Sequence, residues 1–195
     1  MNETADPTAY LHVRIVIGMV LGLAIARTLN GLARFVQKGR RNEVDFLHLG
    51  WSVYLLLYLV SFWWFSFGYT KIFVWTFPVY MFVLFYAALL FLTCAVLYPD
   101  QAPENVTPRE RFETNRAWLY SLLGVLCVVD YADMLIKGPG RLTNLGHPYW
   151  LEILVLAVLF VAAVFVRRRG FDVAVLLIAG LALVRLMMLE FRILQ

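Results

Sequence analysis

Six apolar segments dominate this sequence, and each has about the length that a helix needs to cross a lipid bilayer. A transmembrane helix takes about 20 predominantly apolar residues, because the hydrocarbon core is about 30 Å thick. The chain is 62% hydrophobic and 15% charged over 195 residues, whereas a soluble domain carries about 45–50% apolar and about 25% charged residues. We therefore predict an all-α, polytopic membrane protein, with a single transmembrane domain over residues 1–195. The six predicted spans are 12–36, 47–68, 72–97, 117–136, 149–166 and 171–193.

Basic residues near the span ends predict the orientation of the chain, because Lys and Arg concentrate on the cytoplasmic side. One side of the predicted bundle holds Arg34, Lys38, Arg40, Arg41, Arg109, Arg111, Arg116, Arg167, Arg168 and Arg169. The other side holds Lys71, Lys137 and Arg141, with Arg14 and Arg192 near the termini. This asymmetry predicts both termini outside and connections 37–46, 98–116 and 167–170 in the cytoplasm, as in a bacterial inner-membrane protein.

Aromatic residues add a second positional signal. All six tryptophans lie within a few residues of a predicted span end, where an indole ring meets both apolar chains and polar headgroups. We expect an interfacial belt, in which His48 and Trp51 anchor the start of the second span. Pro78 falls inside the third predicted span, where it should bend the helix.

Two stretches of the chain resemble each other at an offset of 99 residues. KGRRNEVDFLHLGW (38–51) and KGPGRLTNLGHPYW (137–150) each contain Lys-Gly, eight residues and then His-x-x-Trp. The same offset lays the first three spans on the last three. We predict two inverted three-helix repeats, 12–97 and 117–193, joined by the polar connector 98–116, an arrangement typical of transporters. The Lys-Gly pairs then serve as helix ends.

Charged residues inside the predicted spans are candidate functional groups, because each costs roughly 2.5–3.5 kcal/mol at the centre of a bilayer. Arg27, Asn30 and Arg34 share one helix face, and Asp130 and Asp133 share another. Since a helix rises about 1.5 Å per residue, the sequence places Arg27, Arg185 and Asp130 at similar depths. We predict that Asp130 pairs with Arg27, Arg185 or both near the midplane.

These charges predict a transporter or channel for a small ion, more specifically a cation or a proton, with a charged gate. The predicted gate residues are Arg27, Asn30, Asp130, Asp133, Arg185 and Glu190, supported by Arg34, Glu152, Tyr54 and Tyr58. The alternative is a membrane scaffold or accessory subunit, whose buried charges only pair helices.

Enzyme chemistry has little support in this sequence. There is no glycine-rich phosphate loop, no Ser/His/Asp set and no cysteine beside a base; Cys94 and Cys127 lie in apolar runs. We expect no cofactor. His12 and His147 are weak metal candidates and leave a membrane-embedded metalloenzyme as a third alternative. The expected partners are the lipid bilayer and a small ion or proton, not nucleic acid, and the apolar faces leave room for a homo-oligomer.

Overall fold

The computed structural model describes residues 7–37, 45–71, 75–99, 107–138 and 149–193, and all regular structure in these ranges is helical. The helices are α1 (Pro7–Gln37), α2 (Phe46–Phe65), α3 (Phe77–Leu97), α4 (Pro108–Ile136), α6 (Tyr149–Phe165) and α7 (Arg169–Ile193), and the 3-10 helix η2 (Ser66–Lys71) continues α2. Five of them are long and apolar enough to cross a membrane, and α6 is a shorter apolar helix of 17 residues. The prediction of an all-α membrane protein is confirmed.

Helix α4 begins nine residues before the predicted fourth span. Thr107 accepts a hydrogen bond from the backbone N–H of Glu110, and the Glu110 side chain accepts one from the backbone N–H of Thr107. This capping box, with Pro108 in the first turn, starts the helix ahead of its apolar part. Residues 108–116 of the predicted connector are therefore helical and belong to α4.

Pro78 does not bend the third helix. It lies in the first turn of α3, two residues after the N-cap residue Thr76, where the missing N–H of proline has no helical partner to lose. The predicted kink is wrong because the helix begins at Phe77, five residues later than the predicted span.

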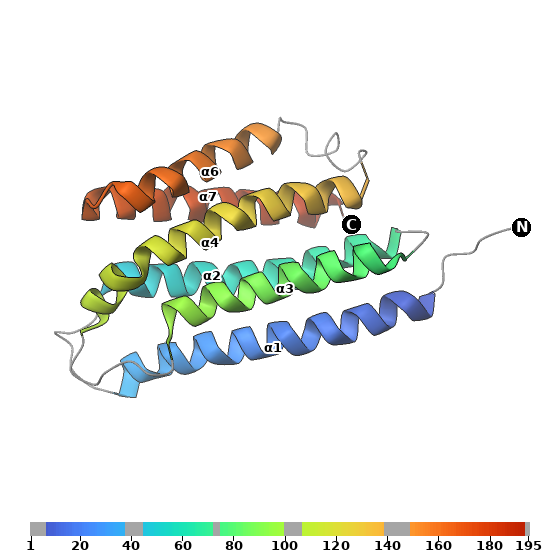
Figure 1. The fold of residues 1–195 in the computed structure, drawn as a ribbon, viewed down its shortest axis with the longest axis horizontal. Coiled ribbons are helices and arrows are strands. Elements are labelled where there is room, and N and C mark those ends of the chain that lie inside the picture. Colours follow the sequence, from blue (N-terminus) through green and yellow to red (C-terminus); the bar gives the residue numbers. More distant parts are fainter. Residues whose placement is uncertain (1–6, 38–44, 72–74, 100–106, 139–148, 194–195) are drawn as a thin grey trace, which may run out of the picture.

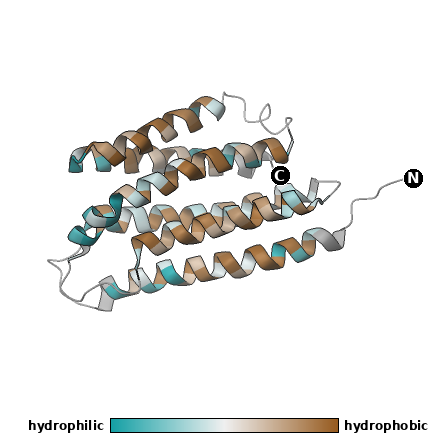
Figure 2. Cartoon of the chain, viewed as in Figure 1, coloured by the Kyte–Doolittle hydropathy of each residue, from teal (hydrophilic) through white to brown (hydrophobic). Residues whose placement is uncertain are grey.

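The helices form two layers (Figure 1). Helices α1, α3, α4 and α6 lie side by side in one layer, and α2 and α7 form the second. Successive helices run in opposite directions, so that α1, α3 and α6 end where α2, α4 and α7 begin. We call this the basic end, because it carries Arg34, Arg109, Arg111, Arg116 and Arg167 to Arg169. Figure 2 shows hydrophilic residues gathered at the basic end of α4 and where α6 connects to α7, and apolar residues dominating the middle.

Helix packing does not follow the predicted 99-residue duplication. That duplication equates α4 with α1 and α7 with α3. Helix α1 packs directly along α3, whereas α4 packs mainly along α6 and reaches α7 through the side chains of Arg116 and Tyr120. The resemblance between the two stretches therefore does not extend to how the helices are arranged.

The predicted anchors at the start of α2 are buried instead. His48 and Trp51 are 1% and 0% exposed, and the Trp51 ring meets Tyr54, Tyr120 and Phe160 at centroid distances of 5.3, 5.5 and 6.3 Å. Helix α2 contacts α1, α3, α4 and α7, so residues at its first turns face other helices. Trp118, Trp150 and Trp64 are exposed on the bundle surface, as the belt predicts.

Tyr98, directly after α3, joins three helices at the basic end. Its carbonyl accepts from Arg27 Nε of α1 at 3.0 Å, and its hydroxyl lies 2.5 Å from Ser52 Oγ of α2. Its ring lies against Gly31, where a Cβ atom would collide with it. Burial raises the pKa of Tyr98 to about 12, so its hydroxyl stays protonated at physiological pH.

Candidate functional site

Asp130 of α4 is held between tyrosines from three other helices. Its carboxylate accepts a hydrogen bond at Oδ1 from Tyr86 of α3, at 2.7 Å, and one at Oδ2 from Tyr149, the first residue of α6. The hydroxyls of Tyr58 on α2 and Tyr86 lie 3.0 Å apart. Within the described ranges, no lysine or arginine lies at ion-pair distance from Asp130.

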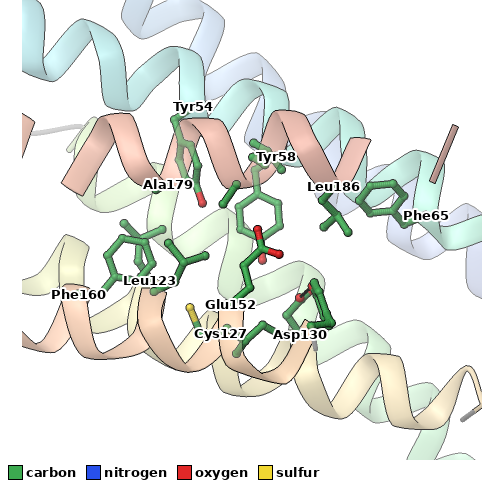
Figure 3. Close-up of a pocket in the computed structure, with 15 residues that line it drawn as sticks. Tyr54, Tyr58, Phe65, Leu123, Cys127, Asp130, Glu152, Phe160, Ala179 and Leu186 are labelled. Atoms are coloured by element: carbon green, nitrogen blue, oxygen red, sulfur yellow. Dashed lines mark hydrogen bonds between the residues drawn. The ribbon is translucent and has the colours of Figure 1, made fainter. Parts of the chain in front are cut away.

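A small, partly open cavity adjoins this carboxylate. The cavity has a volume of about 50 Å³ and lies between α2, α4, α6 and α7. We call it the Asp130 cavity. Figure 3 shows the side chains of Tyr58 and Glu152 reaching into it between apolar neighbours. Its lining includes Tyr54, Tyr58, Cys127, Asp130, Tyr149 and Glu152.

Helical periodicity explains how these groups converge. Tyr54 and Tyr58 lie one turn apart on α2, as do Cys127 and Asp130 on α4, and Tyr149 and Glu152 on α6. Residues three or four apart share a helix face. Each helix therefore turns a pair of polar or polarizable side chains toward one place, and apolar residues of α7 close it. The volume is enough for one or two water molecules.

Asp133, one turn further along α4, belongs to a separate cluster. Its carboxylate accepts from Lys137 Nζ at 2.5 Å and from the Tyr69 hydroxyl. The side chains of Asp133 and Lys137 are 3% and 1% exposed, and the ammonium group lies 4.3 Å from the centre of the Tyr69 ring. Lys137 therefore compensates the charge of Asp133 at the C-terminal end of α4. Gly138 follows with φ +109°, so this Lys-Gly pair does end a helix, as predicted; Lys38 and Gly39 lie outside the described residues.

Arg27 is not joined to Asp130. Arg27 Nε binds the carbonyl of Tyr98, whereas Asp130 binds the hydroxyl of Tyr86. Tyr98, directly after α3, lies twelve residues beyond Tyr86 of α3, about 18 Å along the helix axis. The depths estimated from the sequence placed Arg27 and Asp130 close together, but they did not include the direction of the Arg27 side chain, which points toward the basic end. The predicted Arg27–Asp130 pair is absent from this structure.

The other predicted gate residues are dispersed. Asn30 and Arg34 are exposed on α1. Arg185 of α7 lies near Glu152 rather than Asp130, with Nη1 3.6 Å from Oε2. The Glu190 side chain lies outside the described residues. Of the predicted set, the structure brings together Asp130, Glu152, Tyr54 and Tyr58.

Several contributing groups were missed by sequence reasoning. Tyr86 and Tyr149 were passed over because tyrosine is common in apolar helices and their direction depends on packing. At the basic end, Asp172 accepts from Arg116 at 2.6 Å and Tyr120 at 2.9 Å. Asp45, which starts α2, pairs with Arg169. Asp172 could have been suspected from its place next to an Arg-rich connection.

The histidine metal site gains no support. His12 is exposed on α1, and His147 lies outside the described residues. The part of the chain that the structure describes holds no group of three or more His, Cys, Asp or Glu side chains arranged to bind a metal ion.

Comparison of the chain with protein-family models, with curated proteins and with solved structures gives no match.

Proposed function

We propose that this protein moves a small cation across a membrane, and that the cation is a proton carried by Asp130. The observation that carries the proposal is a partly buried carboxylate inside the bundle, whose partners among the described residues are hydroxyls rather than a cation. A charge placed inside a membrane is costly and is usually retained for function or for helix pairing. Pairing does not account for Asp130, because no described cation neutralises it.

The size of the Asp130 cavity favours a proton over a hydrated metal ion. Each water molecule occupies about 30 Å³ of liquid, so a cavity of about 50 Å³ has little room for an ion with its hydration shell. A proton needs only hydrogen-bonded groups and one or two waters. Tyr58, Tyr86 and Tyr149 supply hydroxyls that both donate and accept.

The path toward the basic end is closed in this conformation. The rings of Trp51, Tyr54, Tyr120 and Phe160 pack against one another between the cavity and the Arg116–Asp172 pair. This aromatic layer favours a transporter that changes conformation over an open channel. In secondary transporters, a fixed central site generally opens to one side of the membrane and then to the other.

The membrane arrangement is part of the proposal. Helix α6 becomes the sixth span, because its 17 residues cover about 25 Å as a helix and tilt or local thinning accommodates a short span. The basic end faces the cytoplasm and both termini face outward, as expected for a bacterial inner membrane. Reporter fusions at positions 104 and 143 should then give opposite locations.

A proton flux assay tests the function. Vesicles containing the protein and a pH-sensitive dye receive a pH gradient with the membrane potential clamped. Asp130→Asn keeps hydrogen-bonding groups for the tyrosines, but an amide does not gain or lose a proton here. Proton flux should therefore fall at least tenfold, while the melting temperature stays close to that of the parent protein. Unchanged flux in a folded Asp130→Asn protein contradicts the proposal.

The matched control is Glu113→Gln, which makes the same chemical change at a carboxylate that is 55% exposed. It should keep parental flux. The scaffold alternative is favoured by the compensated pairs Asp133–Lys137 and Asp172–Arg116, and it predicts no flux above that of empty vesicles for the parent protein.

A further inference from the structure

The outer surface between α6 and α7 carries an open groove directly behind the Asp130 cavity. The groove has a volume of about 440 Å³; we call it the lateral groove. Its lining is Leu151, Glu152, Val155, Leu156, Ile178, Leu181, Ala182 and Arg185. Glu152, Leu156 and Ala182 also line the Asp130 cavity. One layer of side chains therefore separates the two spaces.

Glu152 is the polar member of that layer, and Arg185 holds it. Arg185 Nη1 lies 3.6 Å from Glu152 Oε2, and the two side chains are 52% and 18% exposed. Glu152 is three residues, about 5 Å, from the first residue of α6, and Arg185 is four residues, about 6 Å, from the end of the apolar part of α7. Both therefore lie near the membrane surface, where water and headgroups reach.

We propose that Glu152 is a second proton-binding site and that protons reach Asp130 through the lateral groove, with Arg185 acting as the cation that holds Glu152 when no proton is bound. This inference rests on the proposed function. Arg185 is suited to the role because a guanidinium stays charged at any physiological pH. Among the described residues, the groups that face Glu152 or share its cavity include Arg185, Tyr149, Asp130, Cys127, Tyr54 and Tyr58.

The transfer takes two steps. A proton from water forms an O–H bond with a Glu152 carboxylate oxygen, which becomes neutral, and the ion pair with Arg185 is lost while the guanidinium keeps its own protons. That O–H bond then breaks as the proton passes through cavity water to Asp130 Oδ2, and the Tyr149 hydroxyl turns to another acceptor. Glu152 is again a carboxylate and pairs with Arg185. One proton has moved from water to Asp130.

Cys127 allows access to be measured without measuring flux, because it lines the same cavity. The chain has two cysteines, so Cys94→Ala leaves Cys127 alone. Silver ion is a small cation that reacts with thiols, and its reaction is followed by the loss of free thiol in protein reconstituted in vesicles. Arg185→Gln should speed the reaction of Cys127 at least tenfold, and Arg185→Lys, which keeps the cation, should leave it near the parental rate.

The matched control uses Cys94, which is buried on α3. In a Cys127→Ala background, Arg185→Gln should leave the reaction of Cys94 unchanged. Equal rates for Cys127 with and without Arg185→Gln overturn the proposal, as does a parallel rise at Cys94, because that would indicate general loosening.

Proton flux measurements distinguish a failure of the lateral route from a failure of the proposed function. Glu152→Gln should reduce proton flux at least tenfold, like Asp130→Asn. If Asp130→Asn leaves flux unchanged, the proposed function fails whatever Cys127 does. If Asp130→Asn abolishes flux but Glu152→Gln does not, the function stands and the lateral route is wrong.

Discussion

Asp130 and Asp172 are two aspartates inside the same bundle, and they are held in opposite ways. Asp172 accepts hydrogen bonds from Arg116 and Tyr120, and the side chains of Arg116 and Asp172 are 7% and 6% exposed. Among the described residues, Asp130 accepts hydrogen bonds from tyrosine hydroxyls alone, and it adjoins a cavity. Removing a charge from water is costly in both places. Only at Asp172 does an opposite charge compensate for that cost.

We propose that this difference separates structural charges from functional ones. A compensated pair such as Arg116–Asp172 ties α4 to α7 and has no reason to change its protonation state. A carboxylate held by groups that both donate and accept can gain and lose a proton without breaking a helix contact. We therefore assign stability to compensated pairs such as Arg116–Asp172 and Lys137–Asp133, and we propose that Asp130 serves transport.

The largest expected effect comes from breaking the compensated pair. Arg116→Gln leaves Asp172 buried without a cation and also removes the hydrogen bond from Arg116 Nη2 to the Val166 carbonyl, 2.8 Å long. Removing one partner of a buried pair costs about 3–5 kcal/mol. The free energy of unfolding, measured in detergent micelles with a denaturant, should fall by that amount.

The double variant Arg116→Leu with Asp172→Leu sharpens this result. Replacing a whole buried pair by apolar residues is often neutral or stabilising, so most of the lost stability should return. If the double variant is as unstable as Arg116→Gln alone, the pair does more than compensate charge, and the distinction between Asp172 and Asp130 weakens.

An intermediate effect is expected where hydroxyls hold Asp130. Tyr149→Phe removes the donor to Oδ2 and should reduce stability by about 1 kcal/mol, because hydrogen bonds between membrane helices average ~0.6 kcal/mol and those to charged groups reach ~1.5–3 kcal/mol. Proton flux should fall more than this loss of stability implies. Tyr131→Phe is the control, since Tyr131 is partly buried on the same helix as Asp130. Equal flux in the two variants would remove Tyr149 from the path.

The smallest effect is expected at an exposed pair. Arg109 and Glu113 are one turn apart on α4, and Arg109 Nε lies 2.9 Å from Glu113 Oε1. Their side chains are 64% and 55% exposed. Water and salt screen such a pair, so it contributes little. Glu113→Gln should leave the melting temperature unchanged within error. A clear drop would mean that surface charges matter here as much as buried ones.

Much of the fold could be predicted from the order of residues. Apolar length alone located the helices, because every backbone polar group in hydrocarbon must be satisfied within its own segment. The ends were less certain: the Thr107–Glu110 capping box was legible in the sequence, yet hydropathy placed the start of α4 nine residues late. The same bias toward apolar runs put Pro78 inside a helix that it begins.

The sequence by itself determined that Asp130 and Glu152 lie within apolar helices and need an explanation, because their cost in a membrane follows from residue type and depth. Only the tertiary structure decided their partners. Side-chain direction depends on how each helix is rotated against its neighbours, and that rotation brought Tyr86, Tyr149 and Glu152 to one cavity while it turned Arg27 toward Tyr98. Packing of helices against one another, which no local pattern encodes, therefore selects the site.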